Sequence, residues 1–271
     1  MRKSKTLAKL RSGEPVRICA LGSFLPAFVR HAAHNGFDCI WLDLEHRAME
    51  QRELQALLAF FHLFDIDCMV RTPTLEKTKL YRILEDGAAG VMIPHVSTAE
   101  KARMLVQCLK FPPLGDRGFD GAGLDSDFIL QGSGDYTQRA NDETFLTVQI
   151  ETIEAVRNVE EIAAVPGVDI LFVGPADLGL RLKHDPDCQL TFDDCLSRVA
   201  AAAKKHGKAW GLPVGTPEQV KAMKAKGATF INYGGDFGAM MVMIEKHASE
   251  LDTLYGSRQP KDSTNALRPI D

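Results

Sequence analysis

Two carboxylates follow two consecutive apolar segments of the chain. Glu151 comes directly after residues 145–150, and Asp177 follows residues 168–173 after a short Gly-Pro-Ala link. Hard divalent cations such as Mg²⁺ and Mn²⁺ prefer carboxylate oxygens as ligands. Both segments have the composition of buried strands, and neighbouring parallel strands end at the same edge of a sheet. The spacing therefore predicts a divalent-metal site that contains Glu151 and Asp177.

A histidine and an arginine stand at the ends of two earlier apolar segments. His46 closes the sequence Asp-Leu-Glu-His that begins at Asp43, and Arg71 is the last residue of the segment 67–71. Imidazole exchanges a proton near neutral pH and is the usual side chain for proton transfer. The four residue types together predict a metal ion and a base at the ends of neighbouring strands.

Each of these residues also has an ordinary explanation. Glu151 and Asp177 precede helix-like segments, where an acid can cap the helix or lie favourably in its first turn. A lone His46 is typical of a surface turn, and Arg71 could form an ion pair with Glu45. Glu45 is itself a candidate for an acid that orients a neighbouring group.

The other histidines give weaker signals. His95 follows Pro94 at the end of the segment 90–94, so it could reach the same sheet edge as His46. Six histidines, His95 included, show no spacing typical of metal ligands, and their ordinary role is structural or solvated: His31, His34, His62, His95, His184 and His206.

Short apolar segments alternate with helix-like segments along the whole chain. They are rich in Val, Ile, Leu and Phe, as strands buried on both faces should be, and lie at residues 16–22, 37–43, 67–71, 90–94, 145–151, 168–174, 208–213 and 228–233. A capping box from Ser97 to Glu100 opens one of the helices between them. Eight such units predict an α/β fold, a (β/α)₈ TIM barrel with its active site at the carboxyl ends of the strands. A doubly wound open sheet is the alternative, but no GxGxxG sequence follows the first segment.

Two segments depart from this alternation. Residues 111–143 are long and rich in Gly and Pro, which is typical of a lid or a binding loop. Residues 236–255 form an apolar, methionine-rich helix that can pack on a neighbouring subunit or on its own barrel. We expect one barrel domain over residues 1–255 and a polar tail over 256–271.

The overall composition excludes several classes of protein. The chain has 271 residues, 45% of them hydrophobic and 25% charged, with a formal net charge of −4, so nothing favours nucleic acid or an anionic membrane as a partner. Six scattered cysteines without a CxxC pair predict free thiols in a reducing compartment, and we expect a cytoplasmic protein. Residues 1–7 are basic and lack the apolar core of a secretory signal, and no apolar stretch reaches about 18 residues, so we expect neither a secretory signal nor a membrane span.

The order of the motifs resembles the HpcH/HpaI aldolase family, of the phosphoenolpyruvate/pyruvate-binding barrel superfamily. The resemblance covers residues 13 to 245. Each motif alone is weak, but together they are specific, because they occur in register at predicted strand ends: Asp43-x-Glu45-His46, Arg71-x-Pro73, Pro112-Pro113-x-Gly115-x-Arg117-Gly118, Ala140-Asn141-Asp142, Gln149-Ile150-Glu151 and Gly174-Pro175-Ala176-Asp177-Leu178.

The family implies a class II aldolase, a lyase that cleaves a 4-hydroxy-2-oxo acid to pyruvate and an aldehyde. The reaction is reversible through a metal-bound enolate of pyruvate, and the implied cofactor is Mg²⁺, Mn²⁺ or Co²⁺. The family also implies a homo-oligomer, typically a hexamer with exchanged C-terminal helices. The resemblance gives the site residues these roles: Glu151 and Asp177 bind the metal, His46 is the base that acts through a water near the metal, Arg71 binds the keto oxygen and developing enolate, Gln149 is a polar group near that oxygen, the backbone of Gly174, Pro175, Ala176 and Asp177 cradles the carboxylate, Asp43 lies at the rim of the site or at a subunit interface, and Glu85 stands where the family has an acid that partners the histidine.

Three residues depart from the family pattern. Arg47 stands where a small residue is common, Glu85 replaces an aspartate, and Asp120 lies in the long loop where a small residue is common. The identity of the aldehyde therefore does not transfer with the resemblance. Decarboxylation of oxaloacetate, cleavage of an acyl-CoA and non-catalytic sensing of a 2-oxo acid remain as alternatives.

Overall fold

Nine parallel strands form the centre of the molecule. The computed structural model describes residues 2–256, so the predicted tail lies outside the described residues apart from Gly256. The strands are β1 (Val16–Leu21), β2 (Cys39–Asp43), β3 (Asp67–Arg71), β4 (Gly90–Ile93), β5 (Phe145–Ile150), β6 (Ile170–Val173), β7 (Ala209–Gly211), β8 (Pro213–Val214) and β9 (Phe230–Gly235). All of them lie close to the predicted segments, and the predicted barrel is confirmed.

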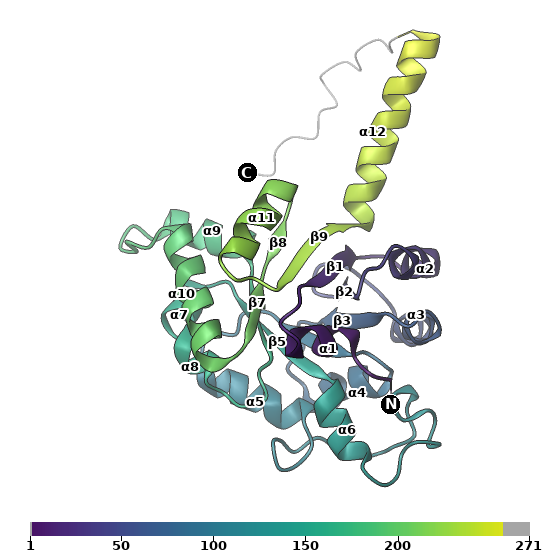
Figure 1. Ribbon diagram of the computed structural model, residues 1–271, viewed down its shortest axis with the longest axis vertical. Coiled ribbons are helices and arrows are strands. Elements are labelled where there is room, and N and C mark those ends of the chain that lie inside the picture. The colour runs from purple at the N-terminus through teal and green to yellow at the C-terminus, as the bar shows by residue number, and fades with distance from the viewer. Residues whose placement is uncertain (1, 257–271) are drawn as a thin grey trace.

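The ring closes through an interrupted strand. The sheet order is β7-β6-β5-β4-β3-β2-β1-β9-β8, and only Leu212 separates β7 from β8. Because β7 pairs with β6 while β8 pairs with β9, these two pieces together occupy the place of one barrel strand. The result is a nearly closed barrel with eight strand positions (Figure 1).

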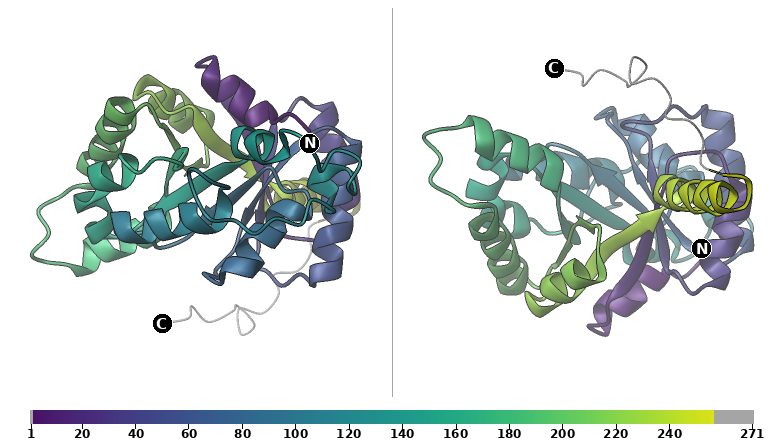
Figure 2. Two further views of the ribbon diagram at one scale, coloured as in Figure 1. Left: turned by 90° about the horizontal axis from the view of Figure 1, so that it is seen from below. Right: turned by 90° about the horizontal axis from the view of Figure 1, so that it is seen from above.

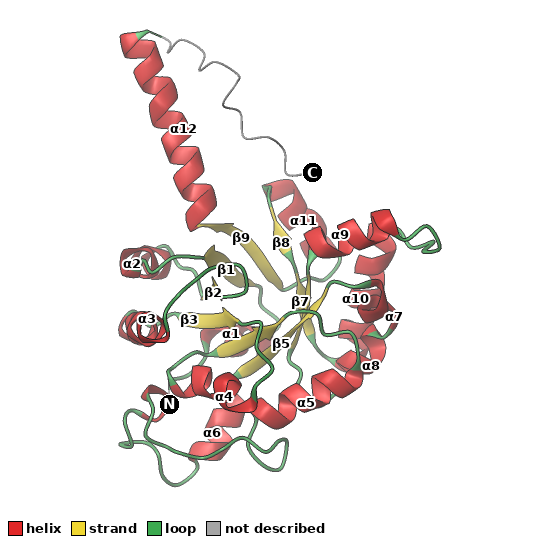
Figure 3. Cartoon of the chain, turned by 180° about the vertical axis from the view of Figure 1, so that it is seen from behind, coloured by secondary structure: helices red, strands yellow, loops and turns green. Residues whose placement is uncertain are grey.

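Helices surround the strands. Figure 3 shows most of them around the sheet, whereas α1 lies across one end of the barrel and α12 departs from the ring. Their bounds are α1 (Lys5–Arg11), α2 (Pro26–His34), α3 (Gln51–Leu63), α4 (Lys77–Glu85), α5 (Ala99–Leu109), α6 (Tyr136–Glu143), α7 (Ile153–Arg157), α8 (Val159–Ala163), α9 (Pro175–His184), α10 (Phe192–His206) and α11 (Pro217–Ala225), with α12 at Asp236–Tyr255 and the 3₁₀ turn η1 at Leu124–Ser126.

Two apolar cores fix the positions of the strand ends. The larger core lies between the strands and the surrounding helices. The smaller one contains large side chains from the other strand face, among them Met92, Phe172 and Phe230, together with Leu7 of α1. Every residue of β3 and β5 is buried, which explains why these strands read as continuous apolar runs. Packing on both faces leaves the strands little freedom to slip, so the residues just after them are held in place.

The long connection 111–143 lies at the amino end of the barrel. It joins the end of α5 to the start of β5, and Glu143 accepts hydrogen bonds from Ser4 and Arg11 of the N-terminal segment. Inside it, Arg117 donates to Asp125, which also accepts from Tyr136. The carboxyl ends of the strands are at the opposite end, so this segment is not a lid over the mouth of its own barrel, and a binding loop stays a prediction. Phe111, Tyr136 and Ala140 of this segment instead form a small apolar core of their own.

Helix α12 projects away from the barrel. None of its residues is buried, and it extends outward from the end of β9, close to β1 (Figure 1). Figure 2 shows the same helix seen along its axis. Phe237, Met241 and Leu254 are among its exposed apolar side chains. Packing of this helix along its own barrel, one of the two expectations, is therefore not observed. None of the helices among residues 2–256 is long and apolar enough to cross a membrane.

Two glycines provide a matched test of the barrel closure. A Cβ atom on Gly211 would lie 1.6 Å from the carbonyl oxygen of Phe230, whereas a Cβ on Gly179 of α9 would meet nothing within 4 Å. We expect Gly211→Ala to lower the free energy of unfolding by more than about 2 kcal/mol, because the backbone must move. Gly179→Ala should raise it slightly, since alanine favours a helix interior. Urea titration of both variants measures the difference, and equal stabilities would contradict this account of closure.

Candidate active site

Arg71 is the best-anchored cation at the carboxyl end of the barrel. Its Nε donates to Oδ1 of Asp43 at 2.9 Å, its Nη2 lies 2.8 Å from Oδ2 of Asp43, and its Nη1 lies 2.9 Å from Oε2 of Glu45. The guanidinium also lies over the ring of Trp41, 4.7 Å from its centroid. Burial raises the pKa of Asp43, but the hydrogen bonds and charge of Arg71 outweigh it and lower the pKa. Asp43 is therefore a carboxylate that orients Arg71.

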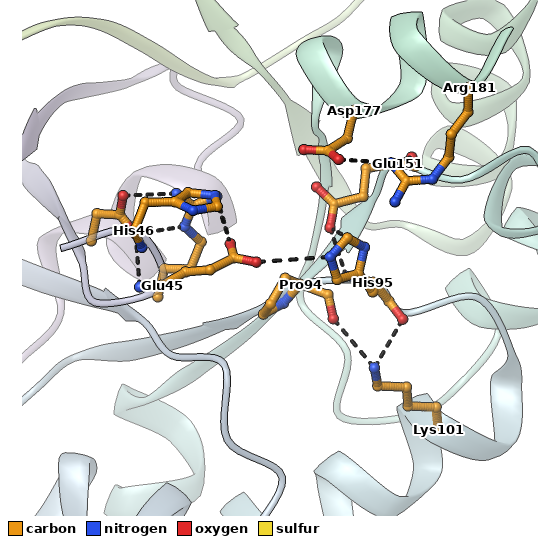
Figure 4. A network of polar contacts seen from close by, with 10 residues as sticks. Glu45, His46, Pro94, His95, Lys101, Glu151, Asp177 and Arg181 are labelled. Atoms are coloured by element: carbon orange, nitrogen blue, oxygen red, sulfur yellow. Dashed lines mark hydrogen bonds and ion pairs between the residues drawn. The ribbon is translucent and has the colours of Figure 1, made fainter. Parts of the chain in front are cut away.

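Glu45 connects Arg71 to two histidines. Its Oε2 lies 3.6 Å from Nε2 of His46, and its Oε1 lies 3.8 Å from Nε2 of His95. The side chain of His46 is more than half exposed, at 57%, so it can meet a substrate at the mouth of the barrel. Figure 4 shows Glu45 between the two imidazoles. The expected ion pair of Arg71 with Glu45 is present, and Glu45 has the position expected of an orienting acid.

Glu151 faces the barrel mouth from the end of β5. The residue is only 1% exposed, and its Oε1 accepts from the backbone N–H of His95 at 2.7 Å and lies 3.0 Å from Nδ1 of that residue. Its Oε2 accepts no hydrogen bond from the rest of residues 2–256. The N-cap of α7 is Thr152, whose side chain accepts from Ala155, so Glu151 is not the capping residue. The capping explanation fails for Glu151, which leaves one oxygen available for a ligand.

Space is kept open around the free oxygen of Glu151. A Cβ atom on Gly174 would lie 2.4 Å from Oε2 of Glu151 and 2.9 Å from Nε2 of Gln149. Gln149 is buried, and its Oε1 has no hydrogen-bond partner among the described residues. A buried amide oxygen without a partner costs about 1–3 kcal/mol and calls for an explanation. A ligand beside Gly174 that interacts with this oxygen would supply one.

Asp177 lies in the first turn of α9, beside Glu151. Its Oδ1 accepts from Nη1 of Arg181 at 2.7 Å, and the same Nη1 donates to the backbone carbonyl of Glu151 at 3.3 Å. Gly174 is the N-cap of α9 and Pro175 its first residue. Register pairs Ile150 with Val173, so β5 and β6 end at the same height. The predicted convergence of Glu151 and Asp177 is therefore observed (Figure 4).

His95 is a site residue that the sequence indicated only weakly. Its backbone has φ of 54°, a left-handed conformation that is uncommon outside glycine, and this conformation accompanies the contacts of both its N–H and its ring with Glu151. Lys101 supports the turn by donating to the carbonyls of Pro94 and His95. The only signal in the sequence was the position of His95 after the fourth strand.

Glu85 does not meet His46 within this chain. It is the last residue of α4, a helix that runs from the carboxyl end of β3 back to the amino end of β4. There it lines a cavity of about 690 Å³ with Tyr81, Arg82 and Asp120. Burial raises the pKa of Glu85, and the charge of Arg117 opposes this. The expected partnership of Glu85 with His46 is therefore not observed within this chain.

The donor set fits a hard divalent cation. Glu151 supplies a buried carboxylate with a free oxygen, Asp177 a second carboxylate, and Gln149 an unpaired amide oxygen. Residues 2–256 contain no group of three or more His, Cys, Asp or Glu side chains arranged around a common metal position. Mg²⁺ commonly takes one or two protein carboxylates and completes its shell with water and substrate. Two carboxylates at an open mouth match that pattern.

Comparison with known proteins agrees with the sequence motifs. Residues 18–242 match the model of the HpcH/HpaI aldolase/citrate lyase family. The 2-dehydro-3,6-dideoxy-6-sulfogluconate aldolase of Pseudomonas putida is 36% identical over 231 residues, 83% of this chain and 87% of that protein. The hydroxypyruvate/pyruvate aldolase of Deinococcus radiodurans is 35% identical over 232 residues, 84% of this chain and 82% of that protein.

Solved structures give the same answer for the fold. The crystal structure of the HpcH/HpaI aldolase from Desulfitobacterium hafniense has a TM-score of 0.83 to this chain at 30% identity, and covers 93% of this chain and 98% of its own. Both of the relatives named above are aldolases, and aldolases are lyases. The predicted resemblance and the predicted reaction class are both confirmed by these comparisons.

The burial of Glu151 predicts how stability depends on pH in the metal-free protein. Burial raises the pKa of Glu151 above its ordinary value of 4.5, although His95 opposes this. A raised pKa means that the folded protein binds a proton at Glu151 more tightly than the unfolded chain does. This contribution to the free energy of unfolding is fully present below pH 4.5 and is lost as the pH rises through the raised pKa. We therefore expect Glu151→Gln, in EDTA, to unfold at a higher temperature than the wild type near pH 8. The difference should shrink toward pH 4.5. If the wild type were more stable than Glu151→Gln at pH 8, the conclusion that burial raises the pKa of Glu151 would be contradicted.

Proposed function

Because this chain belongs to the HpcH/HpaI aldolase/citrate lyase family, we propose that it is a metal-dependent aldolase that cleaves a 4-hydroxy-2-oxo acid to pyruvate and an aldehyde. The observation that carries the proposal is the free Oε2 of buried Glu151, next to the unpaired amide oxygen of Gln149 and the space above Gly174. A buried acid and an unpaired amide are unfavourable on their own, and a cation with an oxygen-rich substrate satisfies both.

Glu151 and Asp177 are the proposed metal ligands. A bound Mg²⁺, Mn²⁺ or Co²⁺ would polarise the keto group of the substrate and lower the energy of negative charge on its oxygen. Asp177 already pairs with Arg181, whose Nη1 lies 2.7 Å from its Oδ1, so a bound cation would share this carboxylate with the guanidinium. We expect Arg181 to hold the carboxylate of Asp177 at the mouth of the barrel.

Arg71 is proposed to hold the keto oxygen. A guanidinium has five N–H donors. Nε of Arg71 donates to Asp43, and Nη2 and Nη1 form ion pairs with Asp43 and Glu45. Nη1 and Nη2 each carry two N–H groups, so we expect donors on both to be available to the oxygen on which charge develops. Since the guanidinium is fixed by two carboxylates and by Trp41, it need not reorganise when that charge forms.

His46 is the proposed base. In the cleavage direction it accepts the proton of the C4 hydroxyl, directly or through a water molecule, and the C3–C4 bond breaks. The electron pair of that bond moves toward the keto oxygen and leaves the enolate of pyruvate, and the same proton is then returned to C3. Glu45, 3.6 Å from Nε2 of His46, stabilises the imidazolium between these two transfers.

The start of α9 is the proposed cradle for the substrate carboxylate. Backbone N–H groups in the first turn of a helix have no partners within it and favour anions. Pro175 has no N–H, so Ala176 and Asp177 provide the nearest donors, and Gly174 leaves room for the carboxylate. A substrate whose carboxylate is held at the start of α9 would have its keto group directed toward the mouth of the barrel.

The identity of the aldehyde, the assembly and the compartment are parts of the same proposal. Relatives act, by name, on sulfogluconate, rhamnonate and glucarate derivatives, which supports a hydroxylated aldehyde product. Helix α12, with its exposed apolar side chains, supports a homo-oligomer such as a hexamer. Six free cysteines support a location in the reducing cytoplasm.

Loss of CO₂ from oxaloacetate is the second candidate reaction, because it requires the same stabilised enolate.

Pyruvate release is the test of this function. Purified protein should release pyruvate from some members of a panel of 4-hydroxy-2-oxo acids, measured with a coupled lactate dehydrogenase. Mg²⁺, Mn²⁺ or Co²⁺ should support the release and EDTA should abolish it. Metal-dependent decarboxylation of oxaloacetate without any aldol cleavage would favour the second candidate, and release that is insensitive to EDTA would contradict the metal proposal.

Variants assign the roles within that assay. His46→Ala should lower kcat by roughly 10²- to 10⁴-fold, which is the usual contribution of a general base. His206→Ala is the matched control, because this histidine ends α10 away from the mouth. Activity of the His46 variant equal to that of the control would remove His46 from the mechanism.

A further inference from the structure

Arg47 lies at the mouth of the barrel, directly after the proposed base. It is exposed, and its side chain lies over Gly22, the residue that follows β1: a Cβ atom on Gly22 would be 3.0 Å from Cγ and 3.1 Å from Nε of Arg47. Nη1 of Arg47 donates to the backbone carbonyl of His46 at 2.8 Å. The cation is thus placed beside the reacting end of the site.

Phe237 holds the guanidinium of Arg47 in one position. The guanidinium carbon lies 4.7 Å from the centroid of this ring, at the start of α12. Stacking on a ring and one hydrogen bond to a carbonyl fix an arginine without neutralising it. Most of its N–H donors, and its full charge, remain available.

The other arginines at the mouth are neutralised. Arg71 is paired with two carboxylates and Arg181 with one. In contrast, the described part of the chain places no carboxylate oxygen within 4.0 Å of a nitrogen of Arg47. The nearby Asp236 accepts a hydrogen bond from the backbone N–H of Gly22. An exposed, fixed and unpaired guanidinium is suited to a ligand anion.

Arg47 and the proposed metal ligands lie on opposite sides of the mouth. In the eight-position ring, β1 and β2 are four places away from β5 and β6. A substrate with its pyruvate part at Glu151 and Asp177 therefore extends its other end toward Arg47. Figure 4 shows His46 across the site from these two acids.

We propose that Arg47 binds an anionic group, a carboxylate, phosphate or sulfonate, at the far end of the aldehyde. This inference rests on the proposed aldolase function and adds the class of the aldehyde to it. The bond to the anion is made to a part of the substrate that does not react, so it acts on specificity, through the kcat/KM for the aldehyde.

Matched pairs of aldehydes test the inference in the direction of synthesis. The Mn²⁺-loaded enzyme is given pyruvate with glyceraldehyde 3-phosphate or glyceraldehyde, and with succinic semialdehyde or butanal. The readout is the ratio of kcat/KM for the anionic member to that for the neutral member of each pair. We expect the enzyme to prefer the anionic aldehyde in at least one pair. The pair with the larger ratio indicates whether phosphate or carboxylate binds better.

Substitution of Arg47 should lower this ratio. Arg47→Gln should reduce it by at least about tenfold, and Arg47→Lys should reduce it less, because lysine keeps the charge but loses the planar donors. Arg30→Gln is the matched control: this guanidinium also lies over a phenylalanine ring, that of Phe64 at 5.5 Å, but on the outer helices. Its ratio should equal that of the wild type.

Two results would overturn the inference. A wild type without a preference in either pair would do so, as would an Arg47→Gln variant that loses equal activity on both members, because that loss means a structural role for the stacking on Phe237. A second experiment tells a wrong role for Arg47 from a wrong function. Pyruvate is incubated with the enzyme in D₂O without any aldehyde, and NMR measures the exchange of its methyl protons for deuterium. Exchange without a preference contradicts only the role of Arg47, and absence of metal-dependent exchange contradicts the proposed function as well.

Discussion

The guanidinium of Arg71 is the interaction on which the arrangement of the site depends. It pairs with both oxygens of Asp43 and with Glu45, and Glu45 in turn contacts His46 and His95. The position of this guanidinium depends on the pairing of two strands and not on a loop, because Asp43 and Arg71 are register partners at the ends of β2 and β3. Because one cation at a rigid sheet edge orders two acids and, through Glu45, two histidines, its loss would leave like charges unpaired at a partly buried position.

The mouth of the barrel is divided electrostatically into two sides. Glu151, buried and with a raised pKa, and Asp177 make one side suited to a cation. His46 and Arg47 follow β2 and lie on the other side, where an unpaired guanidinium is suited to an anion. A substrate with a 2-oxo acid at one end and an anion at the other complements both. The division follows from the order of strands in the ring, since the acids come from β5 and β6.

The sequence predicted the residues whose position depends on strands, and it was less successful with those that depend on turns. The bounds of β3 are those predicted, because a strand buried on both faces is a sharply bounded apolar run. The helix after β4 begins one residue later than the capping box indicated: Thr98 caps it, while Ser97 bonds to Thr152. His95 reaches Glu151 through a left-handed backbone that composition does not encode.

The proposed reaction depends on a cation between Glu151 and Asp177, and Mn²⁺ binding measured by electron paramagnetic resonance tests this most directly. The wild type should bind one ion per chain, and Glu151→Gln and Asp177→Asn should each weaken binding by at least about tenfold, since even outer residues of metal sites contribute that much. Glu160→Gln, whose exposed carboxylate pairs with Lys205, should bind as the wild type does. Binding of equal affinity in the wild type and in both site variants would contradict the account.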